Sequence, residues 1–350
     1  MRQSFYQLLS LLTLSTMIMA APITRAEVSS QQATPQTQTQ TQPDPIPVVA
    51  SFSILANMAE EIGGPLVSVT SLVGPDSDAH VFNPSPTDAR ALSKAKVVVI
   101  NGLGFEGWID RLIKSSGFSG ELVVASNGVK PLGFADEHES HKEKEDDHHD
   151  HGHGHEEDKH DSTRDHHSAK EHDHGDVDPH AWQDLRNGQI YAANIRDALI
   201  AAMPAYREQI QTRAQQYIEQ MGILDQITRE RLDRLAPPFK RVITSHDAFG
   251  YFGHAYGIEF FAAQGWSTDR EVSAADMATI IREIRHDDVR ALFVENMSDP
   301  RLMQRISEET GVRIGGALYS DALSAPGTQA DTYLKMFETN VNTFLQAIEP

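Results

Sequence analysis

Residues 204–235 of the chain read PAYREQIQTRAQQYIEQMGILDQITRERLDRL and decide the architecture that we expect. Apolar or aromatic side chains recur every three or four positions, which is typical of a single helix with one buried face. These side chains are Tyr206, Ile210, Ala214, Tyr217, Met221 and Leu224. Pro204 suits the first turn of such a helix, and Pro237-Pro238 stops it. With a rise of about 1.5 Å per residue the helix would span roughly 45 Å, more than one lobe, so we expect a rigid helix that joins two lobes.

On both sides of this helix, short apolar runs alternate with short helical patterns. The apolar runs before it are residues 48–50, 66–73, 97–100 and 122–125, and those after it are 242–244, 258–262, 291–294 and 312–317. Strands that alternate with helices indicate βαβ units and parallel sheets. We therefore predict an α/β fold with two lobes, each with a central, mostly parallel sheet flanked by helices. The predicted boundaries are 47–202 for the N-terminal lobe, 203–235 for the linking helix and 236–350 for the C-terminal lobe.

The N-terminus has the pattern of an export signal. Arg2 precedes a mostly apolar run at residues 8–21, and Thr24-Arg25-Ala26 offers small residues for cleavage. The run is shorter than the ~20 apolar residues of a membrane span, so we favour a removable signal at 1–26 over an anchor, and we expect no membrane-spanning segment. Residues 27–46 are rich in Gln, Thr and Pro and are predicted to be a disordered linker.

The composition bears on the ligands of a zinc site, on lipid anchoring and on nucleic acid as a partner. The chain has no cysteine, so a zinc site must use histidine and carboxylate ligands. A lipid anchor on a cysteine at the cleavage site is also excluded, so we expect a periplasmic protein that is not lipid-anchored. The formal net charge of -20 makes nucleic acid an unsuitable partner, because phosphate binding needs clustered Lys and Arg.

Most of the histidines lie in one segment. Of 17 His, 12 lie between residues 138 and 174, and residues 136–176 hold 16 acidic against 5 basic side chains. With almost no apolar residues, the segment 136–177 is predicted to be a disordered loop. Such density of imidazole favours weak, adaptable metal binding. The alternative is a solvated, charged loop without function. The candidate accessory ligands are His148, His149, His151, His153, His155, His166, His167, His172 and His174.

Three further histidines and one aspartate occupy comparable places. His80 and His246 lie just past predicted strands, His180 lies just before a helix, and Asp321 follows the strand at 312–317. Loops beyond strand ends are where open α/β sheets bind their ligands. Taken alone, each histidine is more often an ordinary hydrogen-bonding residue. The two remaining histidines, His254 and His286, lie within helices and are assigned to structure.

Five stretches of the chain carry a resemblance to a known family. They are GPDSDAHVFNPSPTD at 74–88, NGLGFEGW at 101–108, DPHAW at 178–182, SHDAFGYF at 245–252 and LYSD at 318–321. In this order they resemble the zinc- and manganese-binding solute-binding proteins of ABC importers, the group that includes ZnuA, TroA and AztC. The resemblance runs from about residue 47 to 348. It implies two lobes joined by a long helix, a metal held in the cleft, and delivery to an ABC permease in the inner membrane.

The resemblance also implies that His80, His180, His246 and Asp321 are the metal ligands. Manganese-binding members of the family typically have Glu in the place of His246, so this chain is similar to the zinc type. Three imidazoles and one carboxylate suit tetrahedral Zn²⁺, whereas Mn²⁺ prefers harder oxygen ligands. Ligand type alone does not exclude Cu²⁺ or Ni²⁺. Some zinc-binding members have a Glu where this chain has Ala79, which favours Asp321 as the fourth ligand.

Three carboxylates are candidates for orienting the ligand histidines, namely Asp178, Asp247 and Glu295. The alternative for each is a helix cap or a solvent-facing side chain.

A zinc hydrolase and a passive metal store are the alternatives to a transport protein. A zinc hydrolase needs an open coordination position and a general base, but Asp321 would close the site, and the chain has no HExxH or GxSxG motif. A passive metal store would need only the histidine-rich loop. We therefore expect a monomeric, non-enzymatic protein that captures Zn²⁺ in the periplasm. Manganese or another divalent metal is the alternative cargo, and a periplasmic zinc chaperone is left open as a further partner.

Overall fold

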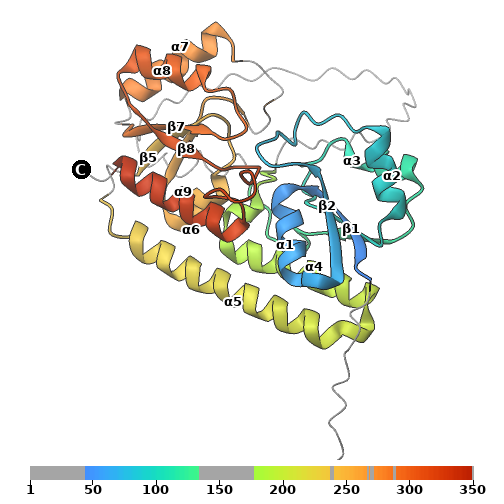
Figure 1. Ribbon diagram of the computed structural model, residues 1–350. Coiled ribbons are helices and arrows are strands. Elements are labelled where there is room, and N and C mark those ends of the chain that lie inside the picture. The colour runs from blue at the N-terminus through green and yellow to red at the C-terminus, as the bar shows by residue number, and fades with distance from the viewer. Residues whose placement is uncertain are drawn as a thin grey trace, which may run out of the picture. The chain divides into compact units, whose positions relative to one another are not determined.

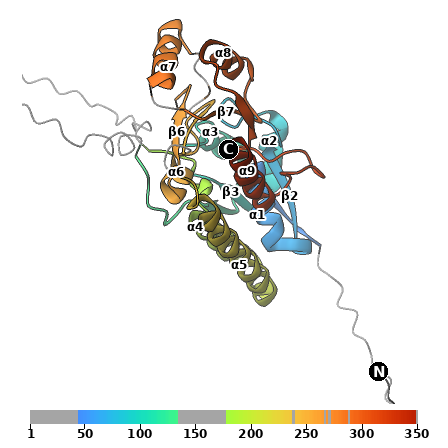
Figure 2. The same cartoon turned by 90° about the vertical axis from the view of Figure 1, so that its left-hand side faces the viewer.

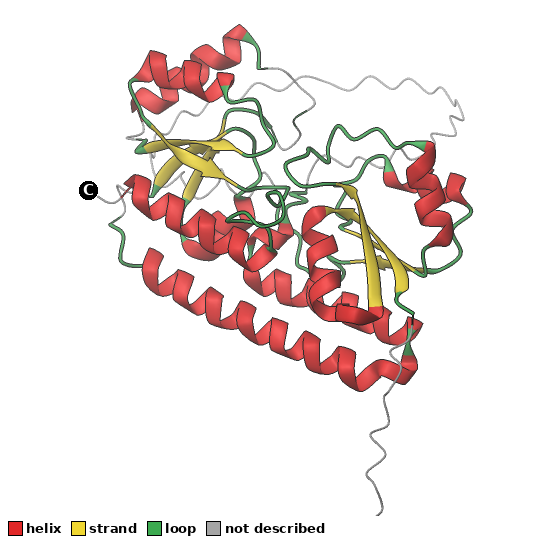
Figure 3. Cartoon of the chain, viewed as in Figure 1, coloured by secondary structure: helices red, strands yellow, loops and turns green. Residues whose placement is uncertain are grey.

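The computed structural model describes residues 44–133, 177–236, 240–265, 268, 272–286 and 289–348. Within them the chain forms two four-stranded parallel sheets, covered by helices (Figures 1 and 3). The strands are β1 Ile46–Phe52, β2 Val67–Val73, β3 Val97–Ile100, β4 Glu121–Val124, β5 Arg241–Thr244, β6 Glu259–Ala262, β7 Ala291–Glu295 and β8 Ile314–Leu318. The α-helices are α1 Ser53–Gly63, α2 Pro86–Lys94, α3 Ile109–Ser116, α4 Leu185–Ala202, α5 Arg207–Leu232, α6 Gly250–Tyr256, α7 Ala274–His286, α8 Arg301–Thr310 and α9 Tyr333–Ile348.

The N-terminal lobe, as we use the term, is the sheet β1–β4 with α1, α2 and α3. Its strand order is β2-β1-β3-β4, and all neighbouring strands are parallel. All four residues of β3, the sequence VVVI, are buried, as expected for a parallel strand covered on both faces. Helix α1 packs on β1 and β2, and α2 packs on α3.

The C-terminal lobe is the sheet β5–β8 with α6–α9. Its strand order, β6-β5-β7-β8, repeats that of the first sheet. Helix α9 packs on β8, α6 packs on β6, and α8 packs on β7 and β8. A small cluster of apolar side chains fills the side of this sheet that α7 and α8 cover. In both sheets the loops that follow the strands therefore lie at the carboxyl ends of the strands. This is the edge of the sheet at which we expect a ligand site.

Helix α5 has 26 residues and connects the two lobes. It is about 39 Å long at 1.5 Å per residue, and it follows a short 3-10 turn at Pro204–Tyr206. It lies alongside α4 (Figures 1 and 2) and also contacts α1, α6 and α9. Its buried side chains include Ile210, Ala214, Tyr217 and Met221, the periodic set of the sequence. The predicted fold class is therefore confirmed, while the predicted domain boundaries stay predictions.

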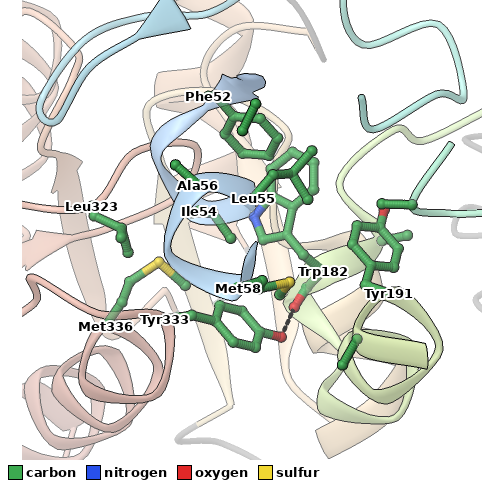
Figure 4. Packing of buried hydrophobic residues seen from close by; sticks show 14 of the residues in the cluster. Phe52, Ile54, Leu55, Ala56, Met58, Trp182, Tyr191, Leu323, Tyr333 and Met336 are labelled. Carbon is green, nitrogen blue, oxygen red and sulfur yellow. Dashed lines mark hydrogen bonds between the residues drawn. The ribbon is translucent and has the colours of Figure 1, made fainter. Parts of the chain in front are cut away.

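One continuous cluster of buried apolar side chains extends from the N-terminal sheet through α4 and α5 to α9. Figure 4 shows its centre, where Phe52 and Trp182 pack with ring centroids 5.0 Å apart. The hydroxyl of Tyr333, at the start of α9, donates a hydrogen bond to the backbone oxygen of Trp182. The two lobes are thus joined by a shared core as well as by a helix.

Helix α1 begins without a side-chain cap. Its N-cap is Phe52, and the hydroxyl of the first helical residue, Ser53, does not cap the helix. The Ser53 hydroxyl instead accepts a hydrogen bond from the backbone N–H of Leu323, 3.0 Å away. A buried hydroxyl satisfies whichever buried donor lies closest, and here that donor comes from the other lobe. At the start of α7, in contrast, Ser273 and Asp276 form a reciprocal capping box.

The described residues on either side of the histidine-rich segment are adjacent in space. Gly133 and Val177 form an antiparallel bridge, and the N–H of Asp178 donates to the oxygen of Leu132 at 2.9 Å. The predicted signal at 1–26, most of the linker at 27–46, and residues 136–176 lie outside the described residues. No helix among the described residues is long and apolar enough to cross a membrane.

Candidate metal centre

The structure brings four of the sequence-predicted site residues together. His80 lies in the loop after β2, His180 directly before the 3-10 turn Ala181–Gln183, His246 in the loop after β5 and Asp321 in the loop after β8. Their ligand atoms all lie within 4.8 Å of one another. The four side chains are 0–2% exposed, so the centre is shielded from solvent.

The spacing of these atoms matches the space that a bound cation needs. Asp321 Oδ2 lies 3.2 Å from His80 Nε2 and 3.1 Å from His246 Nε2, and Asp321 Oδ1 lies 3.6 Å from His180 Nε2. Four ligands in a tetrahedron around Zn²⁺, with bonds of about 2.0–2.1 Å, are roughly 3.3 Å apart. His180 Nε2 and Asp321 Oδ1 are buried without a hydrogen-bond partner among the described residues. Because unpartnered buried polar atoms are costly, this donor set fits a metal cargo.

Two carboxylates hold the far side of the imidazole rings. Asp178 Oδ1 lies 2.7 Å from His180 Nδ1, and Glu295 Oε2 lies 2.6 Å from His246 Nδ1. Such a partner fixes the tautomer in which Nδ1 carries the proton and Nε2 has a free lone pair. Asp178 and Glu295 therefore occupy the orienting position that the sequence suggested. For Asp247, the third candidate, the backbone N–H donates to the oxygen of Gly265.

In the metal-free centre, His246 and Asp321 shift each other's pKa. Burial alone would lower the pKa of the His246 imidazole, but the adjacent carboxylates of Glu295 and Asp321 outweigh it and raise this pKa well above its usual value of 6.5. Burial alone would raise the pKa of Asp321, but His246 and His180 hold it well below its usual value of 3.8. The metal-free site therefore favours a protonated His246 beside an ionised Asp321, and a cation that binds there displaces that proton.

Aromatic side chains form a dry wall around the N-terminal ligands. The Phe105 ring lies 4.9 Å from that of His80 and 5.9 Å from that of His180, measured between centroids. Trp182 packs 5.3 Å from His180. Phe105 and Trp182 are buried. This wall excludes water from one side of the centre and restricts the two rings to one orientation.

Sequence reasoning missed a buried glutamate behind this wall. Glu106 Oε1 accepts hydrogen bonds from the Ser51 hydroxyl and the Asn101 N–H, both at 2.6 Å, and Oε2 accepts from the Gly102 N–H at 3.2 Å. Burial raises the pKa of this carboxyl above its usual value, and the three donors oppose that rise. The signal was present as an acidic residue inside the otherwise apolar, glycine-rich stretch NGLGFEGW.

The turn that Glu106 closes is strained. Gly102, Leu103 and Gly104 have φ values of 85°, 54° and 81°, in the left-handed region. Glycine adopts this region freely, but Leu103 does so at a cost. Such a turn persists only where its surroundings fix it. The carboxylate of Glu106 supplies that fixation, and the turn places Phe105 against the ligands.

The remaining histidines of the sequence analysis fall into two groups. The nine accessory histidines of the histidine-rich loop, from His148 to His174, lie outside the described residues. His254 lies in α6 and His286 is the last residue of α7, as expected for the two histidines assigned to structure.

The chain is similar to known proteins over most of its length. A family model described as the zinc-uptake complex component A, periplasmic, matches residues 48–347. Among curated proteins, the manganese-binding lipoprotein MntA of Halalkalibacterium halodurans is 28% identical over 86% of this chain and 88% of its own length. MntA of Bacillus subtilis is 29% identical over 86% of this chain and 89% of its own length.

Solved structures are similar over nearly the whole described fold. The periplasmic zinc-binding protein TroA from Treponema pallidum matches with a TM-score of 0.73 and 25% identity, over 88% of this chain and 100% of its own. A manganese-bound periplasmic metal-binding protein from Candidatus Liberibacter asiaticus matches with a TM-score of 0.68 and 23% identity, over 86% of this chain and 98% of its own, which shows a common fold.

The relatives correct one prediction. We expected a periplasmic protein that is not lipid-anchored, but the matching proteins MntA, PsaA and SloC are named as lipoproteins, and this contradicts the prediction. The prediction rested on the lack of cysteine. That observation bears on one chemical route of attachment and does not decide whether a protein is held at a membrane.

Proposed function

Because the chain belongs to the periplasmic family of zinc-uptake component A, the substrate-binding part of metal importers of the ABC type, we propose that its cargo is Zn²⁺. In this proposal His80, His180, His246 and Asp321 bind the ion, and the protein delivers it to a permease in the inner membrane. The observation that carries the proposal is the convergence of three imidazole nitrogens and one carboxylate within 4.8 Å. The family consists of transport components, so the protein is not an enzyme.

The choice of zinc rests on the chemistry of the donors. Three neutral nitrogen ligands and one carboxylate are a typical tetrahedral zinc set. Mn²⁺ sits at the weak end of the affinity order for such ligands and prefers oxygen donors. The contacts of Asp178 and Glu295 hold the proton of the neutral ring on Nδ1, so that Nε2 is the nitrogen that faces the metal, and they make the imidazole a stronger ligand.

Manganese is the second candidate, because several relatives are named as manganese-binding proteins. The two carboxylate oxygens of Asp321 both face the ligand histidines. With both oxygens bound, the site would offer two hard donors beside three nitrogens, a set that Mn²⁺ accepts better than a strictly tetrahedral one. Metal choice therefore depends on how Asp321 binds and on the identity of the residue at position 246.

A competitive titration of the full chain tests both candidates. Zinc and manganese are titrated against a chromophoric chelator, for the parent and for His246→Glu. We expect one tight zinc site in the parent. The substitution replaces a nitrogen by oxygen, so zinc affinity should fall by more than about tenfold while manganese gains relative to zinc. Tighter binding of manganese than zinc by the parent would refute the zinc proposal and favour the second candidate.

We further propose that the histidine-rich segment 136–177 binds additional zinc weakly, through residues such as His148, His151 and His155. The support is its composition. Deletion of residues 137–176 tests it, and the bridge between Gly133 and Val177 brings the remaining ends together. The tight site should remain after deletion, and the weaker sites should disappear. Loss of the tight site would instead place the main function in the segment, as a metal store requires. The predicted monomeric state and a zinc chaperone as donor stay proposals.

A further inference from the structure

The peptide group that leads into a ligand residue determines where that residue points. In a planar peptide, the oxygen of one residue lies in the same rigid plane as the nitrogen and Cα of the next. A hydrogen bond to the oxygen before a ligand therefore holds the ligand's own N–Cα bond.

Both N-terminal ligands have one. The indole Nε1–H of Trp108 donates to the oxygen of Ala79, directly before His80, at 2.9 Å. The side-chain Nδ2–H of Asn101 donates to the oxygen of Pro179, directly before the second histidine, also at 2.9 Å. Both donors belong to the short segment 101–108, which includes the strained turn.

The N–H groups of the same two peptide planes also have hydrogen-bond partners. The backbone N–H of His80 donates to Asp78 Oδ1 at 2.8 Å, and the backbone N–H of His180 donates to Asp178 Oδ1 at 2.9 Å. Each of these two peptide groups therefore has a side-chain partner on its oxygen and another on its N–H. Rotation of the plane would break two hydrogen bonds at once.

Asp321 has the corresponding contact from the other lobe. The oxygen of Ser320, directly before it, accepts from Trp182 Nε1 at 2.9 Å and from Gln183 Nε2 at 2.8 Å. For His246, in contrast, the preceding oxygen accepts from the backbone N–H of Gln264 at 3.0 Å. Side-chain donors thus hold the plane before three of the four ligands.

The donor side chains are buried from solvent, and Asn101 is held by further hydrogen bonds. Asn101, Trp182 and Gln183 are fully buried, and Trp108 is 6% exposed. The Tyr191 hydroxyl donates to Asn101 Oδ1 at 2.6 Å, and Glu106 binds the Asn101 backbone. Water cannot replace a donor that is lost here, so the freed carbonyl would turn toward a new partner and carry the ligand with it.

We propose that Asn101, Trp108 and the pair Trp182–Gln183 are positioning residues of the metal centre, which hold the peptide planes before His180, His80 and Asp321. This inference rests on the proposed function, because it concerns the same site. Buried carbonyls need partners wherever they lie, so the test must separate positioning of ligands from stability of the fold.

Two variants and one matched control make that separation. Trp108→Phe keeps an aromatic ring and removes the N–H group. Asn101→Leu removes an amide that donates to two carbonyls, those of Pro179 and Gly102. The control is Asn194→Leu, because Asn194 Nδ2 likewise donates to two carbonyls of the same lobe, those of Ala125 and Asn127, both at 2.8 Å.

The experiment uses the full chain and two probes. Zinc affinity is measured against a chelator, one equivalent of Co²⁺ reports ligand geometry by its visible absorption, and thermal unfolding of the metal-free protein reports stability. We expect Asn101→Leu and Trp108→Phe to lose about tenfold in zinc affinity, the low end of the range for residues behind ligands, and to change the Co²⁺ spectrum. The control should lose stability but keep its affinity within about twofold and its spectrum unchanged.

The opposite results would overturn the inference. If both variants match the parent in affinity and spectrum, or if the control loses as much affinity as they do, the contacts serve the fold alone. If Asn101→Leu does not fold, Trp108→Phe still decides the question. A parent chain without a tight zinc site would refute the proposed function itself, whereas a tight parent site beside unaffected variants would refute only the inference.

Discussion

The two lobes have the same strand order but use a buried glutamate differently. Glu295 is the last residue of the central strand β7, and Glu106 lies in the loop after the central strand β3. Both are thus near the point where the strand order reverses and open sheets bind ligands. In the C-terminal lobe, Glu295 contacts His246 directly, at its backbone N–H and at Nδ1. In the N-terminal lobe, Glu106 binds the backbone of Asn101, which in turn holds the segment before His180. A buried glutamate near this edge of a sheet can thus contact a candidate ligand directly or act through a turn.

A second difference concerns Asp321. By sequence it follows the last strand of the C-terminal sheet, and Tyr319 bonds to Asn340 of α9 in that lobe. The residues around Asp321 also bond to the N-terminal part of the chain. Leu323 donates to the Ser53 hydroxyl, and its oxygen accepts from the N–H of Asp76 at 2.9 Å. The backbone N–H of His246, in contrast, bonds within its own lobe, to Glu295.

The largest expected effect tests whether Asp321 is the common partner of the three histidines. Asp321→Ala removes the only carboxylate of the four-residue centre, so zinc affinity should fall by more than about a hundredfold, beyond the usual range for residues behind the ligands. Chelator competition measures it. Asp276→Ala, at an exposed helix start in the same lobe, is the control and should not change affinity. Comparable affinity in the two variants would remove Asp321 from the site.

The next effect compares the carboxylates behind the histidines. Glu295→Gln and Asp178→Asn should each lower zinc affinity by about 10- to 100-fold. The loss should be greater for Glu295, because it binds both the N–H and Nδ1 of His246 through separate oxygens. A glutamine side chain has only one acceptor oxygen, so it can accept only one of these two contacts. Equal losses would show that the two lobes orient their histidines equally well.

A smaller effect tests the attachment of Asp321 to the N-terminal lobe. Ser53→Ala leaves the buried N–H of Leu323 without its acceptor, so the free energy of unfolding should fall by about 1–3 kcal/mol. Zinc affinity should fall by less than about tenfold. Ser93→Ala, an exposed position in α2, should change stability by no more than about 0.5 kcal/mol. Chemical denaturation of the metal-free proteins measures both. An unchanged stability in Ser53→Ala would mean that this contact does not tie the lobes.

The smallest effect is the pH dependence of the metal-free protein. The raised pKa of His246 contributes stability that is full below its usual 6.5 and is lost as pH rises through the folded-state pKa. The lowered pKa of Asp321 contributes stability that is present above 3.8 and is lost as pH falls through its folded-state pKa. Melting temperature should therefore decline by the order of a few degrees above pH 6.5. His246→Asn should remove this decline, and a variant that retains it would assign it to another group.

Much of this organisation could be predicted from the sequence. The long helix follows from periodicity and the eight strands from short apolar runs. The four candidate ligands lie beside strand or helix ends, but only the family resemblance singles them out as a set. Asp178 and Glu295 were two of three candidates for the orienting role. The donors behind the ligands could not be predicted, because Trp108 bonds across 29 positions, Asn101 across 78 and Gln183 across 137. No local pattern specifies such pairs, and only the packed fold determines them.

The bridge between Gly133 and Val177 has a consequence for how the length of the chain between them can change. A stretch that leaves and rejoins the fold at neighbouring points imposes no distance on its ends. Each doubling of such a loop costs only about 0.6 kcal/mol of closure entropy. The stretch between these two residues can therefore change in length at little cost in free energy to the rest of the fold, including the four clustered side chains.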